Sequence, residues 1–150
     1  MASGKSTPGE FDLVVKKAKT GRGLFSNSHI KKGARVIEYT GRTLKEGEKY
    51  TSRSRYLFDL DNGVTIDGYI AANKARFINH SCRPNCESTT RAGRVWIRAV
   101  RAIKPGEELT YDYGEEYFGA YLKDICACPK CEAKRQREAA KAKPVLLAAE

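Results

Sequence analysis

The sequence contains no uninterrupted stretch of about 18 apolar residues, the length that a membrane-spanning helix requires, so no transmembrane segment is expected. Residues 1–9 lack the apolar core of a secretory signal, which predicts a cytoplasmic protein if the source is bacterial and a nuclear one if it is eukaryotic. Long internal repeats are missing too. With 150 residues, of which 41% are hydrophobic, the chain is expected to form one domain with short tails.

Three short motifs fall short of the sites that they resemble. Gly4-Lys-Ser6 lies too near the start for the first glycine of a phosphate-binding loop, and no strand precedes it. Thr20-Gly-Arg-Gly-Leu-Phe25 is followed by Ser26 where a dinucleotide-binding motif needs a third glycine, which leaves either a close backbone approach to a ligand or a hairpin turn. Asp59-Leu-Asp-Asn-Gly63 resembles a calcium loop, but Gly63 replaces the third ligand and Ile70 stands where the bidentate glutamate is required. The sequence therefore excludes a nucleoside-triphosphate site and a calcium loop.

Cysteine is scarce and odd in number. Three of the five cysteines, Cys126, Cys128 and Cys131, fall within six residues, which is too crowded for an independent disulfide framework. In a reducing compartment such clustering favours a metal, and structural zinc usually takes four ligands that are often all cysteine. The fourth ligand must be Cys82 or Cys86, and spacing alone leaves both open. We predict one structural zinc bound by Cys82 and the three clustered thiols, with Cys86 free.

Basic residues outnumber acidic ones by 28 to 18. Part of this excess follows the cysteine cluster, in Lys134-Arg-Gln-Arg137 and at Lys141 and Lys143. The stretch is rich in helix-forming residues but has little apolar face, so it is expected to be a marginal helix or disordered. A basic excess attracts acidic partners, and we therefore expect residues 134–150 to be a basic tail that can contact nucleic acid.

The pattern contains no alternation of strands with long amphipathic helices, which argues against a doubly wound fold. Many short strands and a few short helices remain, so a mainly β fold is expected. The Asn-Gly pair between two apolar runs predicts a hairpin across residues 56–66. Strands are expected at 11–15, 34–39, 56–60, 64–66, 94–103 and 108–111, and helical turns at 44–51, 69–78 and 115–122.

Functional groups concentrate in two stretches. Arg76-Phe-Ile-Asn-His-Ser-Cys-Arg-Pro-Asn-Cys86 holds an amide, an imidazole, a hydroxyl and two thiols. Because Pro84 disfavours helix at the residue before it, this stretch is expected to be a short helix that ends in a loop. Polar groups on such a loop are more often functional than polar groups on a solvated helix face. Gly106-Glu-Glu-Leu-Thr-Tyr-Asp-Tyr-Gly114 follows downstream and precedes the cysteine cluster.

Together with the cysteine cluster, these stretches resemble the SET-domain protein lysine methyltransferases that carry a post-SET zinc module, and they are most similar to trithorax-type members. Gly21-Arg-Gly-Leu-Phe25 and Val36-Ile-Glu-Tyr-Thr-Gly41 extend the resemblance, which runs in family order from about Thr20 to Cys131. The combination of motifs is specific, whereas each motif alone is a weak signal.

The resemblance implies a β-rich SET-domain fold with a C-terminal pseudoknot, in which the C-terminal segment passes under an earlier loop, and a small zinc knuckle. The implied division is a disordered tail over 1–10, the SET catalytic domain over 11–118, the post-SET zinc segment over 119–133 and the basic tail. It also implies S-adenosylmethionine as the cofactor. The residues implied to bind it are Thr20, Arg22, Tyr56, Asn79 and His80, the last through its backbone.

A narrow channel for the target lysine is implied as well, walled by the catalytic aromatics Tyr39, Phe58, Tyr111 and Tyr113. Desolvation and a nearby positive sulfonium both disfavour the ammonium form of lysine, so no dedicated carboxylate base is required. The Tyr113 hydroxyl is expected to assist and to hold the methyl group through weak C–H···O contacts. The resemblance also implies that Tyr111 and Phe58 flank the lysine nitrogen and that a tyrosine at the first position restricts methylation, so a mono- or dimethylated product is expected; the tyrosine hydroxyl would restrict rotation of the alkylated amine.

The predicted function is methyl transfer from S-adenosylmethionine to a lysine of a basic protein, such as a histone or another DNA-binding protein. One alternative is a zinc-bearing nucleic-acid-binding module, which the charge and Trp96 among arginines favour. Another is an inactive relative that binds peptides. The dispersed basic residues argue against the first alternative, and the presence of Tyr113 with Asn79 and His80 argues against the second.

Overall fold

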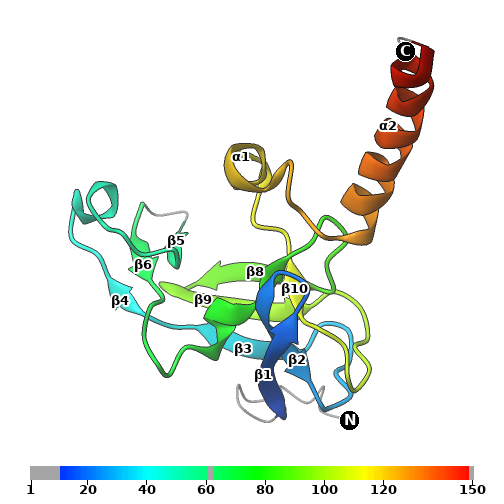
Figure 1. Cartoon of the computed structure of the whole chain (residues 1–150). Coiled ribbons are helices and arrows are strands. Elements are labelled where there is room, and N and C mark those ends of the chain that lie inside the picture. The colour runs from blue at the N-terminus through cyan, green and yellow to red at the C-terminus, as the bar shows by residue number, and fades with distance from the viewer. Residues whose placement is uncertain (1–10, 61–62, 149–150) are drawn as a thin grey trace.

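The computed structural model describes residues 11–60 and 63–148, so the expected disordered tail over 1–10 and part of the Asp61-Asn-Gly63 turn lie outside the described residues. Short strands dominate, and one long helix, α2 (Pro129–Ala148), projects from the β-rich body (Figure 1). The mainly β prediction is confirmed. Within the described ranges, no helix is both long and apolar enough to cross a membrane.

The described chain begins with an antiparallel hairpin of β1 (Leu13–Ala18) and β2 (Gly21–Ser26). Gly21 at the turn has a φ of 111°, which side chains with a Cβ rarely tolerate. The glycine-rich stretch therefore forms a hairpin turn, and this observation does not exclude the approach of a ligand to the same turn. The predicted strand at 11–15 is present but begins at Leu13.

A three-stranded antiparallel sheet has the order β3 (Arg35–Tyr39), β9 (Arg94–Ala99), β8 (Cys86–Arg91). Strand β3 was predicted from its branched apolar residues, and β9 from the alternation of basic and apolar residues. Strand β8 was not predicted, because Glu-Ser-Thr-Thr-Arg after Cys86 shows no apolar alternation. It forms by pairing along its whole length with β9. The Ala92-Gly93 turn between them has positive φ at both residues, 52° and 74°, as tight hairpins require.

Two smaller sheets complete the body. Strands β5 (Leu57–Asp59) and β6 (Thr65–Asp67) form the predicted hairpin, and β4 (Arg42–Thr43) pairs with the other edge of β6. Strand β7 (Asn79–His80) pairs in parallel with β10 (Thr110–Tyr111). This pair brings together the two stretches that concentrate functional groups, although they lie far apart in the sequence.

Other helical segments are short, namely η1 (Glu48–Tyr50), η2 (Lys74–Phe77), α1 (Glu115–Tyr117) and the π-helical turn η3 (Phe118–Leu122). The helix expected over 69–78 is confined to η2. Its first half is a turn because the buried Asn73 amide donates to the Gly68 carbonyl at 3.0 Å and accepts from the Thr40 N–H at 3.3 Å. The segment after Cys131 is helical, and α2 already begins inside the cysteine cluster.

The core lies against β2, β3 and β9 and extends to the residues that flank β7 and β10. Its fully buried apolar side chains include Leu24, Ile30, Val36, Ile78, Val95, Ile97, Ile103 and Leu109. Ile78 directly precedes β7 and Leu109 directly precedes β10. The short β7–β10 pair is therefore anchored by apolar burial at the start of both strands.

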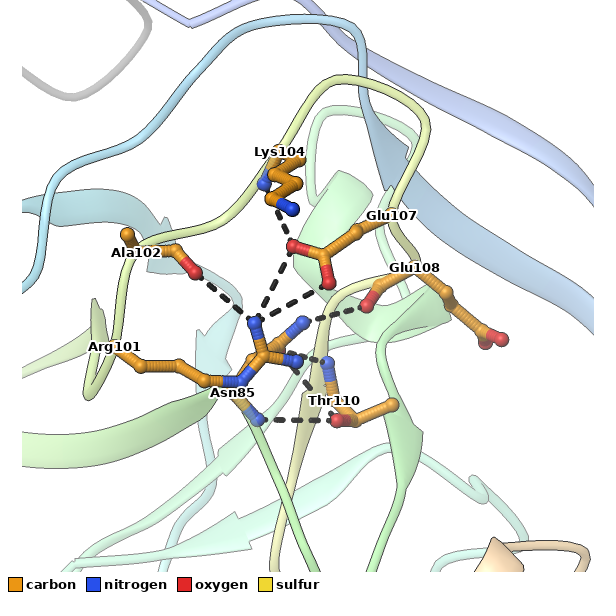
Figure 2. Close-up of polar contacts among 7 residues, drawn as sticks. All are labelled: Asn85, Arg101, Ala102, Lys104, Glu107, Glu108 and Thr110. Atoms are coloured by element: carbon orange, nitrogen blue, oxygen red, sulfur yellow. Dashed lines mark hydrogen bonds and ion pairs between the residues drawn. The ribbon is translucent and has the colours of Figure 1, made fainter.

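Hydrogen bonds of Asn85 link the loop after β7 to the start of β10 (Figure 2). Asn85, only 3% exposed, donates from Nδ2 to the Glu108 carbonyl at 2.8 Å, and its Oδ1 accepts from the Thr110 N–H at 2.9 Å. Its own N–H donates to Thr110 Oγ1 at 3.3 Å. Nearby, Arg101 and Glu107 form an exposed ion pair at 3.2 Å. Asn85 thus satisfies backbone groups on both sides of Leu109, just where β10 begins.

We expect Asn85→Ala to lower the free energy of unfolding by about 2 kcal/mol, because it leaves the half-buried Glu108 carbonyl and Thr110 N–H without their partner. Urea unfolding measures this loss, and the slope of the transition should stay unchanged. Arg101→Ala is the control, because Arg101 forms a separate, exposed ion pair with Glu107, and its loss should cost less than about 1 kcal/mol. Equal losses in the two variants would contradict the role given to Asn85.

Candidate active site and cysteine cluster

A cleft with a volume of about 1390 Å³ lies beside the β7–β10 pair. Pockets for a single small ligand are typically about 300–1,000 Å³, so this cleft has room for a cofactor together with a substrate side chain. Its walls come from β5, β7 and β10, from the β1–β2 turn and from the helical segment 115–122. The lining includes all nine residues predicted to bind cofactor or lysine, which are Thr20, Arg22, Tyr39, Tyr56, Phe58, Asn79, His80, Tyr111 and Tyr113.

Four aromatic rings follow one another along the cleft. The Tyr39 and Phe58 ring centroids are 5.2 Å apart, those of Phe58 and Tyr111 are 6.4 Å apart, and those of Tyr111 and Tyr113 are 4.8 Å apart. All three pairs are tilted by 39° to 51°. Tyr117, which the sequence did not single out, extends the row with a T-shaped contact to Tyr113 at 5.4 Å. The structure therefore brings the predicted aromatics together as one wall.

The phenol groups of this wall are held neutral. Burial raises the pKa of Tyr39, Tyr111 and Tyr113 above the ordinary tyrosine value. The Tyr39 hydroxyl donates to the Tyr56 carbonyl at 2.8 Å, and the Tyr113 hydroxyl donates to the Ile78 carbonyl. None of these groups is a phenolate near pH 7, so the wall offers hydroxyl oxygens rather than a negatively charged base.

Tyr39 can occupy its position only because Gly68 lacks a side chain. A Cβ at Gly68 would lie 2.5 Å from the Tyr39 hydroxyl oxygen and 2.6 Å from the ring. Rings cannot approach a carbon this closely, so any larger residue would push Tyr39 out of the wall. Tyr56, which accepts the Tyr39 hydrogen bond, stacks in turn on Tyr69 with centroids 5.7 Å apart and planes 5° apart.

Asn79 lies at the polar end of the cleft. Its Nδ2 donates to the Arg22 carbonyl at 3.0 Å and to Glu108 Oε2 at 2.8 Å. Both amide hydrogens are thus used, which leaves Oδ1 as the acceptor available to a ligand. Gly23 makes this possible, since a Cβ there would lie 2.6 Å from Glu108 Oε2.

Glu108 is a site residue that sequence reasoning missed. It stands inside the quoted stretch from Gly106 to Gly114, but nothing in its spacing distinguishes it from the neighbouring Glu107. The structure separates the two carboxylates. Glu107 pairs with Arg101 on the surface, whereas the Glu108 side chain points away from that network (Figure 2) and bonds Asn79.

His80 uses both ring nitrogens within the protein. Its Nδ1 accepts from the Tyr113 N–H at 3.0 Å, and its Nε2 lies 3.3 Å from Cys82 Sγ. Burial lowers the pKa of His80, against the smaller effect of Asp112. The imidazole is therefore engaged and neutral, and both of its nitrogens already have partners within the protein.

Four thiols gather where the C-terminal segment meets the loop after β7. The sulfur atoms of Cys82, Cys126, Cys128 and Cys131 all lie within 4.8 Å of one another. Sulfurs around a tetrahedral zinc, each about 2.3 Å from the ion, would lie roughly 3.8 Å apart, so the cluster fits such an ion. Cys126 and Cys128 also line the cleft.

The thiol pKa values of Cys82, Cys126 and Cys128 are shifted in different directions. Burial raises the pKa of Cys82, and it raises the pKa of Cys126 to about 11. At Cys128 burial acts in the same sense, but backbone hydrogen bonds from Cys131 and Cys82 outweigh it and lower the pKa to about 6. These hydrogen bonds thus favour the thiolate at Cys128, and a bound cation would favour the thiolate form of the other ligands.

Cys86 takes no part in the cluster. It opens β8, is 1% exposed and belongs to the apolar core, where burial raises its pKa to about 12. Spacing left Cys82 and Cys86 as alternatives, and the structure places Cys82 among the other three thiols.

Comparison with known proteins gives a consistent answer. Residues 21–114 match the family model described as SET domain. The histone-lysine N-methyltransferase ash1 of Drosophila melanogaster is 37% identical over 142 residues, which covers 85% of this chain and 6% of the relative. Human histone-lysine N-methyltransferase 2B is 39% identical over 145 residues, covering 89% of this chain and 5% of the relative. Trithorax of Drosophila melanogaster is 34% identical over 139 residues, with coverage of 85% and 4%. The chain therefore spans only a small part of each relative.

Proposed function

This chain belongs to the SET-domain family, and on that basis we propose that it transfers a methyl group from S-adenosylmethionine to a lysine side chain of a basic protein. The observation that carries the proposal is the tilted row of Tyr39, Phe58, Tyr111 and Tyr113, which shares one cleft with the polar Asn79 end. The similar proteins named above are histone-lysine N-methyltransferases, which supports a histone or another DNA-associated protein as substrate. The reaction would take place in the nucleus of a eukaryotic cell or in the cytoplasm of a bacterial one.

The cleft residues fit the cofactor. When bound, S-adenosylmethionine supplies a methyl group on a positively charged sulfur. Asn79 Oδ1 would accept a hydrogen bond from its amino group, and the Arg22 guanidinium would pair with its carboxylate. Thr20, at the β1–β2 turn, and the His80 backbone would hold the remainder, with Tyr56 against it. Glu108 would keep the Asn79 amide in the required orientation.

The aromatic wall would prepare the lysine. A free lysine has a pKa of about 10.4 and is almost entirely protonated at neutral pH. Rings that exclude water destabilise the ammonium form, so the proton leaves to solvent and the neutral amine remains. Tyr113 is itself neutral, and its oxygen, whose hydrogen is given to Ile78, would present lone pairs to the polarised C–H groups of the methyl. Most of the rate gain would come from positioning.

We propose zinc as the occupant of the four-cysteine cluster. Four thiolates in a closed set are the ligand type that structural zinc prefers. The ion would fasten the segment that contains Cys126, Cys128 and Cys131 to Cys82, and so hold the C-terminal wall of the cleft in place.

The basic helix supports a second contact. Lys130, Lys134, Arg137 and Lys141 are all exposed and follow one another at intervals of four, three and four residues, which puts them on one face of α2. We name these four residues the α2 stripe. A row of cations fits a phosphate backbone, so we propose that the stripe contacts the nucleic acid with which the substrate is associated. This contact replaces the broader alternative of a nucleic-acid-binding module, because the chain also carries a SET domain.

Tyr113→Phe should lower kcat by about 100-fold, since the variant loses the hydroxyl that acts at the reacting centre. The affinity for S-adenosylmethionine, measured by calorimetry, should change by less than about twofold because the ring remains. Tyr121→Phe is the control, as Tyr121 also lines the cleft but is 67% exposed. Wild-type turnover in Tyr113→Phe would refute the role proposed for Tyr113.

Metal analysis tests the cluster. We expect one zinc per wild-type chain, loss of zinc in Cys82→Ser and retention in Cys86→Ser, because only Cys82 lies among the three clustered thiols. Chelation should loosen the C-terminal segment before the β core, since ligation couples the metal to local order. Retention of zinc in Cys82→Ser together with its loss in Cys86→Ser would overturn the assignment.

Tyr111 should govern the degree of methylation. Its hydroxyl has no hydrogen-bond partner among the described residues, so it is available to a water or to the lysine amine. One such bond, at about 1.4 kcal/mol, changes a rate tenfold. The wild-type chain should give mono- and dimethyllysine, and Tyr111→Phe should shift the product towards trimethyllysine. Mass spectrometry of a peptide reads the outcome, and Tyr39→Phe, whose hydroxyl is bonded to Tyr56, should not shift it. Abundant trimethyllysine from the wild type would contradict the prediction.

Neutralising the α2 stripe should weaken DNA binding and leave peptide methylation intact. A variant with alanine at Lys134, Arg137 and Lys141 should show a smaller slope of log affinity against log salt. The slope should fall by about 0.9 for each phosphate that the variant no longer neutralises. The control replaces Lys31, Lys32 and Lys104, which are exposed and lie outside α2, so that both variants carry three fewer positive charges. An equal fall in affinity in the two variants would show that total charge, rather than the stripe, attracts DNA.

A further inference from the structure

The His80 side chain lies between the cysteine cluster and the catalytic Tyr113. It is 4% exposed and sits in a fixed position, with the Tyr113 and Phe118 rings each 5.4 Å from its own. One nitrogen is 3.0 Å from the Tyr113 N–H and the other is 3.3 Å from Cys82 Sγ. Cys82 Sγ lies 3.6 Å from Cys131 Sγ, inside the cluster. A single imidazole therefore touches both sites.

The direction of both hydrogen bonds follows from the partners. A backbone N–H can only donate, so Nδ1 must accept from Tyr113 and carries no hydrogen. In a neutral imidazole the hydrogen then lies on Nε2, which faces Cys82 Sγ. Asp112 Oδ1 is 3.7 Å from Nδ1, beyond hydrogen-bond distance, and its side chain is 56% exposed, so it does not compete for this nitrogen.

We propose that His80 is a positioning residue that couples the cysteine cluster to Tyr113: its Nε2–H donates to the Cys82 thiolate, and its Nδ1 holds the Tyr113 N–H. The inference rests on the proposed zinc site and on the proposed role of Tyr113. An N–H that donates to a metal-bound sulfur fixes both the ring and the ligand, as partners outside the ligand shell commonly do. Metal binding then orders the backbone of Tyr113, which lies at the reacting centre and not at the metal.

Two substitutions of His80 test its hydrogen bond to Cys82 and its hydrogen bond to Tyr113 separately. The oxygen of an asparagine side chain reaches about as far as Nδ1, and the nitrogen of a glutamine side chain reaches about as far as Nε2. His80→Asn should keep the bond to Tyr113 and release zinc about tenfold faster to a chromogenic chelator. His80→Gln should keep zinc at the wild-type release rate and lower kcat about tenfold with an unchanged KM for the peptide. His29→Asn is the control, because His29 is exposed and belongs neither to the cleft lining nor to the cysteine cluster.

One measurement on the unmodified zinc-loaded protein keeps the proposal testable even if both His80 variants fail to fold. The ¹⁵N resonances of the His80 ring should show hydrogen on Nε2 and none on Nδ1. In cobalt-substituted protein, His80→Asn should shift the sulfur-to-cobalt charge-transfer band, because the thiolate loses a donor. Hydrogen on Nδ1, or wild-type zinc release together with an unshifted band in His80→Asn, would overturn the proposal. A wild-type chain that binds no zinc would instead refute the proposed zinc site. An inactive wild-type chain with the expected ¹⁵N pattern would refute only the proposed methyltransferase function.

Discussion

The parallel pairing of β7 with β10 is the constraint on which the site depends. It comprises only two residue pairs, Asn79 with Thr110 and His80 with Tyr111, so its ladder alone cannot hold two distant segments together. Burial of Ile78 and Leu109 directly before the strands anchors both segments in the core. The ordering cost of a long loop grows only slowly with its length, so such a pair is stable once both segments are anchored in the core.

One physical effect, exclusion of water, explains several properties of the cleft at once. It raises the pKa values of the wall tyrosines and lowers that of His80, so the site keeps its groups neutral. The same effect would remove the proton from a lysine that enters between the rings. A site built in this way needs no buried carboxylate as base, and its carboxylate Glu108 instead orients an amide.

Contacts on two sides of the cleft hold its residues in place. On the sheet side, Asn85, Gly23 and Gly68 fix backbone and rings by hydrogen bonds and by close approach. On the C-terminal side, none of the described side chains of α1 and η3 is buried, and the cysteine cluster brings Cys126, Cys128 and Cys131 of that segment against Cys82 of the body. The Arg135 side chain adds a hydrogen bond to the Cys126 carbonyl at the base of α2. The cluster therefore supports the weaker wall of the site.

The sequence by itself determined the features that depend on neighbours along the chain. The hairpin across 56–66 and the crowding of three cysteines follow from local geometry, and the family motifs identified the aromatic residues of the wall. Tertiary structure decided what depends on partners distant in sequence. Strand β8 exists only because β9 pairs with it, and that pairing turns Cys86 into the core and leaves Cys82 for the cluster. Likewise, Glu108 and the His80 ring acquire their roles from contacts with Asn79, Tyr113 and Cys82, which no periodicity encodes because side-chain direction across a fold is set by packing.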